Sequence, residues 1–326
     1  MLETYRLSKS YGKESVLIDF NLQVESGEII SVVGGSGSGK TTLLRLVSGL
    51  ELPDDGKIIL NNHIVNDDNI FIPPEERDCS LVFQDYALFP NISMRQNIYF
   101  GKNSTHNKER VNDLIRVTKI EKILDKFPHQ CSGGEQQRVA LVRSLAVNPS
   151  LIMMDEPLSN LDYNLKSTLG LMVRKLLKQF NTTAIIVTHD INDAMEISDK
   201  IVVIDKGQVI QEGLPNEIYN NPNSKKAALI FGKTNFIPLS MFPNSTNYFF
   251  DDDSKESMIS IRPNQFTLYD ERVTSVDKVF SGRIESIRKV ASELKLVLKC
   301  NELRLNVSLN TFTDFVKGDK LKVVAK

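Results

Sequence analysis

Tryptophan is absent from this 326-residue sequence, and cysteine is scarce, with only Cys79, Cys131 and Cys300. Three scattered cysteines do not suit a disulfide framework and favour a reducing compartment. A long hydrophobic run is missing too: no segment approaches the roughly 18 apolar residues that a membrane-spanning helix needs. The first residues, Met1 to Arg6, have no hydrophobic signal core. We therefore expect a soluble protein of the cytoplasm.

An excess of charge of either sign is also missing. Forty Lys and Arg side chains stand against 41 Asp and Glu side chains, a formal net charge of −1. This balance provides no electrostatic reason to expect nucleic acid or an anionic lipid surface as a partner. Apolar residues (41%) and charged residues (25%) have ordinary globular proportions, which excludes disorder, collagen and coiled coil. The length predicts about two domains.

The first two-thirds of the chain alternates short apolar runs with helical patterns. The runs are apolar on both faces, as in parallel strands buried beneath helices. They are Ile29–Val33, Leu81–Phe83, Leu151–Met154, Ala184–Val187 and Ile201–Ile204. Residues 164–180 carry an apolar stripe with helical spacing, and a shorter stripe at 111–118 indicates a small helical insertion. The alternation predicts an α/β fold with a parallel sheet.

The pattern changes after about residue 235, where helical periodicity gives way to alternation broken by Gly and Asn. Five segments predict strands there: Met258–Arg262, Gly282–Val290, Leu294–Leu298, Leu303–Leu309 and Leu321–Val324. We therefore predict an α/β domain over 1–235 and a small all-β, barrel-like domain over 236–326.

A glycine-rich segment follows the first predicted strand and fits the pattern G-x-x-x-x-G-K-[ST]. Its residues are Gly34, Gly35, Ser36, Gly37, Ser38, Gly39, Lys40 and Thr41, and the helical segment Thr42–Leu50 comes next. Glycines let backbone N–H groups converge on phosphate oxygens, and the helix N-terminus adds its dipole. Lys40 is placed to reach the β- and γ-phosphates, and Thr41 to ligate Mg²⁺. A glycine-rich turn that matches by chance is the alternative.

A second chemical element is the strand Leu151–Met154, which leads into Asp155 and Glu156. A carboxylate at the end of a rigid strand is the hard oxygen ligand that Mg²⁺ requires beside phosphates. Glu156 is placed to polarise an attacking water. Taken alone, the pair is equally explained as an ordinary strand-to-turn sequence.

Three further segments have ordinary structural explanations when each is taken alone. His189 follows a predicted strand, where a capping or surface histidine is common, and Gln84 follows another. Ser132 is a candidate helix N-cap, with Glu135 completing a capping box. Their order along the chain is more specific: Lys40, Gln84, Ser132-Gly133-Gly134, Asp155-Glu156 and His189.

In this order the elements resemble the ATP-binding-cassette (ABC) ATPase family over about residues 1–235. They are similar to its phosphate loop, glutamine loop, signature, acidic strand and switch histidine. The resemblance implies a P-loop NTPase cassette with a helical subdomain at about 86–145, and ATP and Mg²⁺ as cofactors. Tyr11 is similar in placement to the adenine-stacking aromatic residue of the family, and Thr42 extends its ATP-binding set.

The resemblance also implies a role for each residue. Glu156 would be the general base, His189 would hold the γ-phosphate, and Gln84 would sense the water and Mg²⁺, whose other ligands would be Thr41 and Asp155. In the family, the signature acts on the nucleotide of a second cassette, which implies a head-to-tail homodimer. The residues of this kind are Ser132, Gly133, Gly134 and Glu135, with Asp162 in the loop that couples the two sites.

Two positions depart from the family pattern. Cys131 stands where Leu is usual, and Glu135 where Gln is commoner. Neither departure alters Ser132, Gly133 or Gly134, so we expect activity to survive. Cys131 is expected to be a small buried hydrophobe, with thiol sensitivity near the site as the alternative.

A single cassette followed by a small OB- or TOBE-like β domain resembles the ATPases of ABC importers. This implies a homodimer at the cytoplasmic face of the inner membrane, two integral-membrane permease subunits and an extracytoplasmic solute-binding protein. No nucleic acid is implied. The segment Asp85–Pro90 resembles the region on which a permease helix docks; an ordinary apolar turn is the alternative.

The transported solute is the least specific inference. Residues 260–266 and 227–232 are similar to segments of ferric-iron import ATPases, so we expect ferric iron. Import of polyamine, sugar or sulfate by the same motor is the alternative. A permease-free regulatory ABC ATPase is a rival of a different class, and an exporter is a further rival, although exporters commonly lack the β tail.

Overall fold

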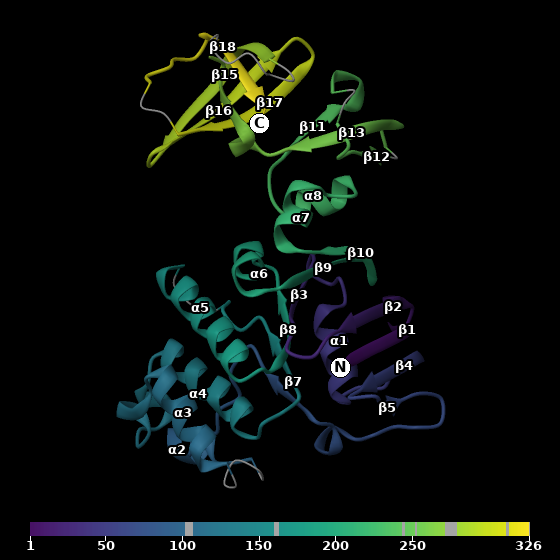
Figure 1. The fold of residues 1–326 in the computed structure, drawn as a ribbon, viewed down its shortest axis with the longest axis vertical. Helices are drawn as coiled ribbons and strands as arrows, with labels where there is room; N and C mark the ends of the chain where they lie inside the picture. The colour runs from purple at the N-terminus through teal and green to yellow at the C-terminus, as the bar shows by residue number, and fades with distance from the viewer. Residues whose placement is uncertain are drawn as a thin grey trace. The chain divides into compact units, whose positions relative to one another are not determined.

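The computed structural model describes residues 1–101, 107–159, 163–242, 245–251, 253–270, 279–310 and 313–325, without the side chains of 163–165. The chain forms two compact units, Met1–Pro215 and Asn216–Lys326 (Figure 1). The first mixes helices with sheets, and the second consists mainly of antiparallel strands, which confirms the predicted fold class. In the described part of the chain, no helix is long and apolar enough to cross a membrane.

A six-stranded sheet forms the centre of the first unit, in the order β10-β9-β3-β8-β7-β6. Its strands are β3 (Ile29–Val33), β6 (Cys79–Val82), β7 (Leu151–Asp155), β8 (Thr183–Thr188), β9 (Lys200–Asp205) and β10 (Gln208–Gly213). All pairs are parallel except that of β10 with β9. Ile152 and Met154 pack in one core cluster, and Leu151 and Met153 in another. The sheet is therefore buried on both faces, as the apolar runs predict.

A second, antiparallel sheet packs against the helix after the glycine-rich loop and is missing from the sequence-based prediction. Its order is β2-β1-β4-β5. The elements are β1 (Leu2–Tyr11), β2 (Glu14–Val24), β4 (Asp55–Leu60), β5 (His63–Asn66) and helix α1 (Lys40–Ser48). Leu43 and Val47 of α1 share a core cluster with Leu7 and Phe20. The pairing of β1 with β2 shifts register at three places, and such bulges break the alternation that marks a half-buried strand.

Helices pack on the other face of the central sheet. They are α2 (Met94–Ile98), α3 (Lys108–Thr118), α4 (Gly133–Ala146), α5 (Tyr163–Gln179) and α6 (Ile191–Ile197), with 3₁₀ turns at Glu121–Ile123 and Pro128–Gln130. A further 3₁₀ turn, Pro74–Glu76, comes between β5 and β6. Helix α5 lies where the stripe at 164–180 predicts it, and the apolar residues of 111–118 are buried on α3. Between β6 and β7 the described residues contain helices and no strand, which matches a helical subdomain.

The second unit contains a three-stranded sheet, β11-β13-β12, and a five-stranded antiparallel sheet, β14-β18-β15-β16-β17. The strands are β11 (Asn235–Pro238), β12 (Phe249–Asp251), β13 (Glu256–Ile261), β14 (Phe266–Leu268), β15 (Val279–Val290), β16 (Glu293–Cys300), β17 (Leu303–Leu309) and β18 (Lys320–Ala325). The 3₁₀ turns are Leu239–Met241 and Pro263–Gln265. Leu294, Leu296 and Leu298 alternate into one core, as the sequence pattern predicts.

The two compact units divide after Pro215, earlier than the predicted boundary at 235. Helices α7 (Pro215–Asn220) and α8 (Lys225–Ile230) group with the β-rich unit. One reason is Arg262, whose buried guanidinium donates to the carbonyl oxygens of Tyr219 at 3.2 Å, Ala228 at 2.9 Å and Gly232 at 3.2 Å. Because these helices bond to a residue beyond β13, their helical pattern does not assign them to the preceding domain.

Candidate nucleotide site

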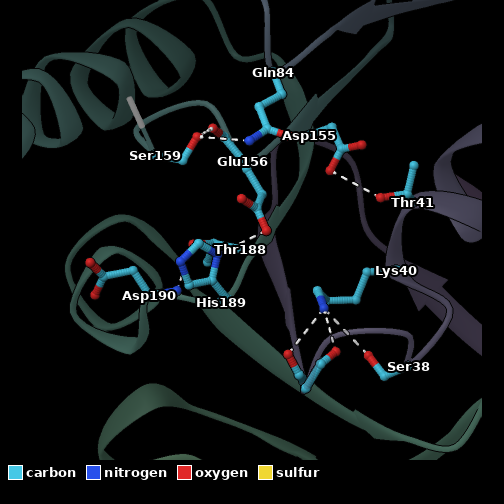
Figure 2. A network of polar contacts seen from close by, with 12 residues as sticks. Ser38, Lys40, Thr41, Gln84, Asp155, Glu156, Ser159, Thr188, His189 and Asp190 are labelled. Atoms are coloured by element: carbon cyan, nitrogen blue, oxygen red, sulfur yellow. Dashed lines mark hydrogen bonds and ion pairs between the residues drawn. The ribbon is translucent and has the colours of Figure 1, made fainter. Parts of the chain in front are cut away.

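Residues from four distant parts of the sequence meet beside the glycine-rich loop (Figure 2). Strand β3 leads into the loop, β6 precedes Gln84, β7 ends at Asp155 with Glu156 next, and β8 precedes His189. Parallel strands of one sheet have their carboxyl ends at the same edge, and this edge is where α/β proteins bind ligands. The sheet order thus explains the convergence.

The loop itself requires glycine at particular positions. A Cβ added to Gly34 would lie 2.3 Å from the backbone oxygen of Ile204, and Gly39 has a φ of 102°. Gly39 is also the N-cap of α1, so the free N–H groups of the first helical turn face the loop. Thr42 lies in that turn. This arrangement suits an anionic, phosphate-like ligand.

Lys40 is 8% exposed and lies within the loop. Its Nζ donates to the backbone oxygens of Gly34 at 3.0 Å and Gly35 at 2.8 Å, and Figure 2 shows it reaching toward Ser38 as well. Burial lowers the pKa of the Lys40 ammonium, while nearby carboxylates oppose that shift. The loop therefore contains one positive charge in partly dry surroundings, where its attraction to phosphate is strong.

Thr41 and Asp155 provide the hard oxygen atoms that Mg²⁺ prefers. Thr41 Oγ1 donates to Asp155 Oδ1 at 3.3 Å. Burial raises the pKa of Asp155, so a nearby cation would favour its charged form. Among the residues with described positions, no cluster of three or more His, Cys, Asp and Glu is suited to a metal ion. Mg²⁺ commonly takes one or two protein ligands and completes its shell with phosphate oxygens and water, so the pair fits it.

Glu156 and His189 form a polar pair, with Glu156 Oε1 and His189 Nδ1 2.8 Å apart. The chain turns sharply after β7: Glu156 has a φ of 46°, which is unusual for a residue other than glycine. Its N–H still donates to Val187 of β8 at 2.8 Å. The side chains are 21% and 60% exposed, respectively, so the pair is open to a ligand. A carboxylate in this position can accept a proton from water.

Gln84 connects to the same loop as Glu156. Its Nε2 donates to Ser159 Oγ over a long 3.5 Å, and Ser159 Oγ donates to the backbone oxygen of Glu156 at 3.0 Å (Figure 2). The glutamine is therefore near the carboxylate that the sequence predicts as general base. Asp162, the predicted coupling residue, lies outside the described residues.

Ser132 and Glu135 form the capping box that the sequence allows. Glu135 N donates to Ser132 Oγ at 3.4 Å, and Ser132 N to Glu135 Oε2 at 2.8 Å, at the start of α4. The ordinary structural explanation thus holds for these two residues. The segment, with Gly133 and Gly134, is not part of the network in Figure 2. A phosphate contact by these residues requires a second chain and stays a prediction.

Two contacts near the site are not predicted by the sequence. Gln137 of α4 is buried and donates to the backbone oxygen of Pro157, directly after Glu156. Tyr11, which is 46% exposed at the end of β1, donates its hydroxyl to Glu51. No sequence motif marks Gln137 or Glu51. Gln137 follows the signature segment closely, and Glu51 follows the end of α1; this closeness in sequence is the only indication of either contact.

Cys131 is half-buried and packs against the core cluster of the helices. Burial and the nearby Glu135 raise the pKa of its thiol, which lowers the thiolate fraction at neutral pH. Both observations favour the expected role as a small hydrophobe over thiol sensitivity.

This chain is similar in sequence to known proteins. The sequence profile of a family described as ABC transporter matches residues 17–159. The Fe(3+) ions import ATP-binding protein FbpC 1 of Pectobacterium atrosepticum is 37% identical over 82% of this chain and 79% of its own length. The sulfate/thiosulfate import ATP-binding protein CysA of Synechocystis sp. is also 37% identical, over 89% of this chain and 82% of its own.

A solved structure agrees with the fold. The ATP-binding cassette MJ0796, seen as a dimer in a post-hydrolysis state with bound ADP and Pi, is 28% identical with a TM-score of 0.57. The similarity covers 66% of this chain and 99% of that cassette. Together with the converging phosphate loop, acidic strand and histidine, these similarities establish that the chain belongs to the ABC transporter family, as an ATP-binding ATPase subunit.

Proposed function

We propose that this chain is the ATP-hydrolysing subunit of an importer, and that Glu156 is its general base. The observation that carries the proposal is the meeting of Glu156, His189 and Gln84 beside Lys40 at one sheet edge (Figure 2). Lys40 and the loop N–H groups bind the phosphates, and Glu156 takes the proton of the attacking water. His189 orients Glu156 and holds the γ-phosphate.

Mg²⁺ belongs to the proposed site. Thr41 Oγ1 and Asp155 Oδ1 would hold it, and Gln84 would sense its coordination. Bound Mg²⁺ neutralises phosphate charge. Burial raises the pKa of Asp155 although the nearby Lys40 and Arg45 lower it, so a further cation at this place would favour the charged carboxylate.

A homodimer is the proposed assembly. Ser132, Gly133 and Gly134 would contact the nucleotide of the second copy, and Asp162 would couple the two sites. Gly133 and Gly134 begin helix α4, and a Cβ added to Gly133 would meet open space, which supports the approach of a phosphate to the start of this helix. That the cassette MJ0796 is a dimer with bound ADP and Pi also supports this arrangement.

The proposed docking site for a permease is the exposed pair of Phe89 and Phe100. Their rings are 4.2 Å apart and the residues are 40% and 62% exposed. Tyr86 of the predicted docking segment is buried, and Arg143 donates to the backbone oxygens of Tyr86 and Ala87 at 2.9 and 2.7 Å. Arg143 thus holds the backbone of the segment that leads into Phe89. Exposed aromatic residues are favoured at interfaces.

Phe89→Asp is expected to release the chain from membranes that contain its permease, because a carboxylate would be buried without a partner in the interface. The measurement is the membrane-bound fraction in cell extracts. Val316→Asp is the matched control, since Val316 is 64% exposed in the β-rich unit. An unchanged membrane-bound fraction for Phe89→Asp would remove this pair from the docking site.

Ferric iron is the proposed solute, supported by the FbpC-type relative and by the two matching segments of the C-terminal third. The CysA-type relative is equally identical, so sulfate is the alternative that the comparisons favour most directly. Polyamine and sugar import are the others. We place the subunit at the cytoplasmic face of the inner membrane, beneath two permease subunits that receive solute from an extracytoplasmic binding protein.

Cells with a chromosomal Lys40→Ala substitution are expected to lose uptake of labelled ferric iron almost completely, because the variant loses the cation that binds the phosphates. Labelled sulfate, putrescine and maltose are measured in parallel. Loss of uptake of one of these solutes, with iron uptake unchanged, would support the importer proposal and reject iron as its solute. If all four solutes entered at wild-type rates, the importer proposal would fail for these substrates and a permease-free regulatory ATPase would be favoured.

A further inference from the structure

The segment that follows helix α1 fixes the tip of strand β1. Asp54 N donates to the backbone oxygen of Ser8 at 2.9 Å. The Asp54 carboxylate accepts bonds from Ser10 N at 2.6 Å and from Lys9 Nζ at 2.9 Å. Both the backbone and the carboxylate of Asp54 therefore hold the three residues of β1 that precede Tyr11.

Glu51, three residues before Asp54, holds the Tyr11 side chain itself. The phenol donates to one carboxylate oxygen of Glu51, and Arg45 Nη1 donates to the other at 3.0 Å. The Glu51 side chain is 22% exposed, whereas that of Arg45 is 52% exposed. Both bonds are made to a charged acceptor, and such bonds are stronger than neutral ones. The far end of the ring is thus fixed while 46% of Tyr11 stays accessible.

The ending of α1 brings the carboxylate to the ring. Gly49 caps the helix with a left-handed backbone, and the N–H groups of Leu50 and Glu51 both donate to the backbone oxygen of Arg45, at 2.9 and 3.2 Å. The same helix begins at Lys40. One rigid element therefore has the phosphate-binding residues at its start and the support of the aromatic ring at its end.

We propose that Glu51 is a positioning residue for the nucleotide base. Through the phenol it holds the Tyr11 ring in one orientation, so that an adenine stacks on a surface that is already ordered. The proposal rests on the nucleotide site proposed above. A ring without this bond rotates more freely, and the cost of ordering it then appears as weaker binding of the base. Arg45 acts one step further away, because it fixes the carboxylate that fixes the ring.

Glu51→Ala is expected to raise the Kd for Mg–ATP about 5- to 10-fold, less than the full strength of a charge-assisted hydrogen bond, because the lost bond orders the ring and does not itself contact the nucleotide. The Kd for inorganic tripolyphosphate, which has no base, is expected to stay within about twofold, because the loop and Lys40 bind it. Glu51→Gln keeps an oxygen that accepts the phenol and should recover most of the ATP affinity. Titration calorimetry on the purified full chain measures all three, with Glu212→Ala as a surface-carboxylate control.

Tyr11→Phe separates positioning from a general effect on the fold, because it keeps the ring and removes only the hydroxyl. Because the Tyr11 hydroxyl also bonds the Thr42 side chain, the loss of ATP affinity in Tyr11→Phe should be at least as large as that of Glu51→Ala, and the double variant should lose no more than Tyr11→Phe alone. The proposal is overturned if Glu51→Ala weakens tripolyphosphate as much as ATP, or if it weakens ATP further in the Tyr11→Phe background. Wild-type chain that binds tripolyphosphate without preferring ATP would instead contradict the assignment of Tyr11 to the base.

Discussion

Glu156→Gln is expected to lower ATP hydrolysis by at least about 100-fold, since general bases commonly contribute factors of 10² to 10⁴. Glutamine has nearly the same size and can still contact His189, now 2.8 Å from the carboxylate. It does not accept a proton from water at neutral pH. The residues proposed to bind the phosphates and Mg²⁺, Lys40, Thr41 and Asp155, are unchanged, so ATP should still bind with an affinity near that of wild type.

The variant should also accumulate as an ATP-dependent dimer, because bound ATP is no longer consumed. Phosphate release measures the first effect, and sedimentation with and without ATP measures the second. Glu212→Gln, a half-exposed carboxylate paired with Lys200, is the matched control and should retain wild-type turnover. Hydrolysis by Glu156→Gln within a few-fold of wild type would show that another group, such as His189, takes the proton.

Arg262→Ala is expected to destabilise the β-rich unit by about 3 kcal/mol, because it removes a buried side chain that donates to three backbone oxygens. The oxygen of Ala228, a buried residue, loses its donor, and those of half-buried Tyr219 and exposed Gly232 lose a bond to a cation. Arg262 is 1% exposed, and its guanidinium also lies 4.6 Å from the centre of the Tyr219 ring. Burial lowers the pKa of Arg262. For a domain of this size, such a loss corresponds to a fall of roughly 10–20 °C in Tm.

Differential scanning calorimetry of the full chain measures this effect, and hydrogen exchange of α7 and α8 locates it. Arg262→Lys keeps one cation with fewer, differently arranged donors and should lie between Ala and wild type. Arg304→Ala is the matched control, since Arg304 is 72% exposed in its ion pair with Glu285. Such surface pairs contribute about 0–1 kcal/mol. Equal losses for Arg262→Ala and Arg304→Ala would contradict the role of Arg262.

Much of the nucleotide site follows from local sequence, because its chemistry depends on short spacings. The loop from Gly34 to Thr41 needs small residues and one cation in a fixed order, and the strand before Asp155 is apolar on both faces. These patterns predicted β3, β7 and the start of α1 without knowledge of the sheet. His189 and Gln84 were ambiguous alone, because a residue after a strand has many uses.

The sequence does not predict features that depend on contacts between residues far apart in the chain. The antiparallel pair of β1 and β2 is not evident in the sequence, because β-bulges shift its register and interrupt the alternation of apolar and polar residues. Helices α7 and α8 have ordinary helical patterns, and tertiary contacts such as their bonds to Arg262 show that they group with the β-rich unit. The capping of Gly49 and the reach of Glu51 to Tyr11 likewise depend on how two elements meet.

The sequence by itself determined the phosphate loop, the acidic strand, the buried parallel strands and the family, because each is written in consecutive residues or in a fixed order of motifs. Only the tertiary structure decided which of these residues touch. Glu156 meets His189 because β7 and β8 are neighbours in the sheet, and Tyr11 meets Glu51 because the end of α1 lies beside the tip of β1. Such contacts depend on sheet order and packing, which hydrophobic patterning along the chain does not specify.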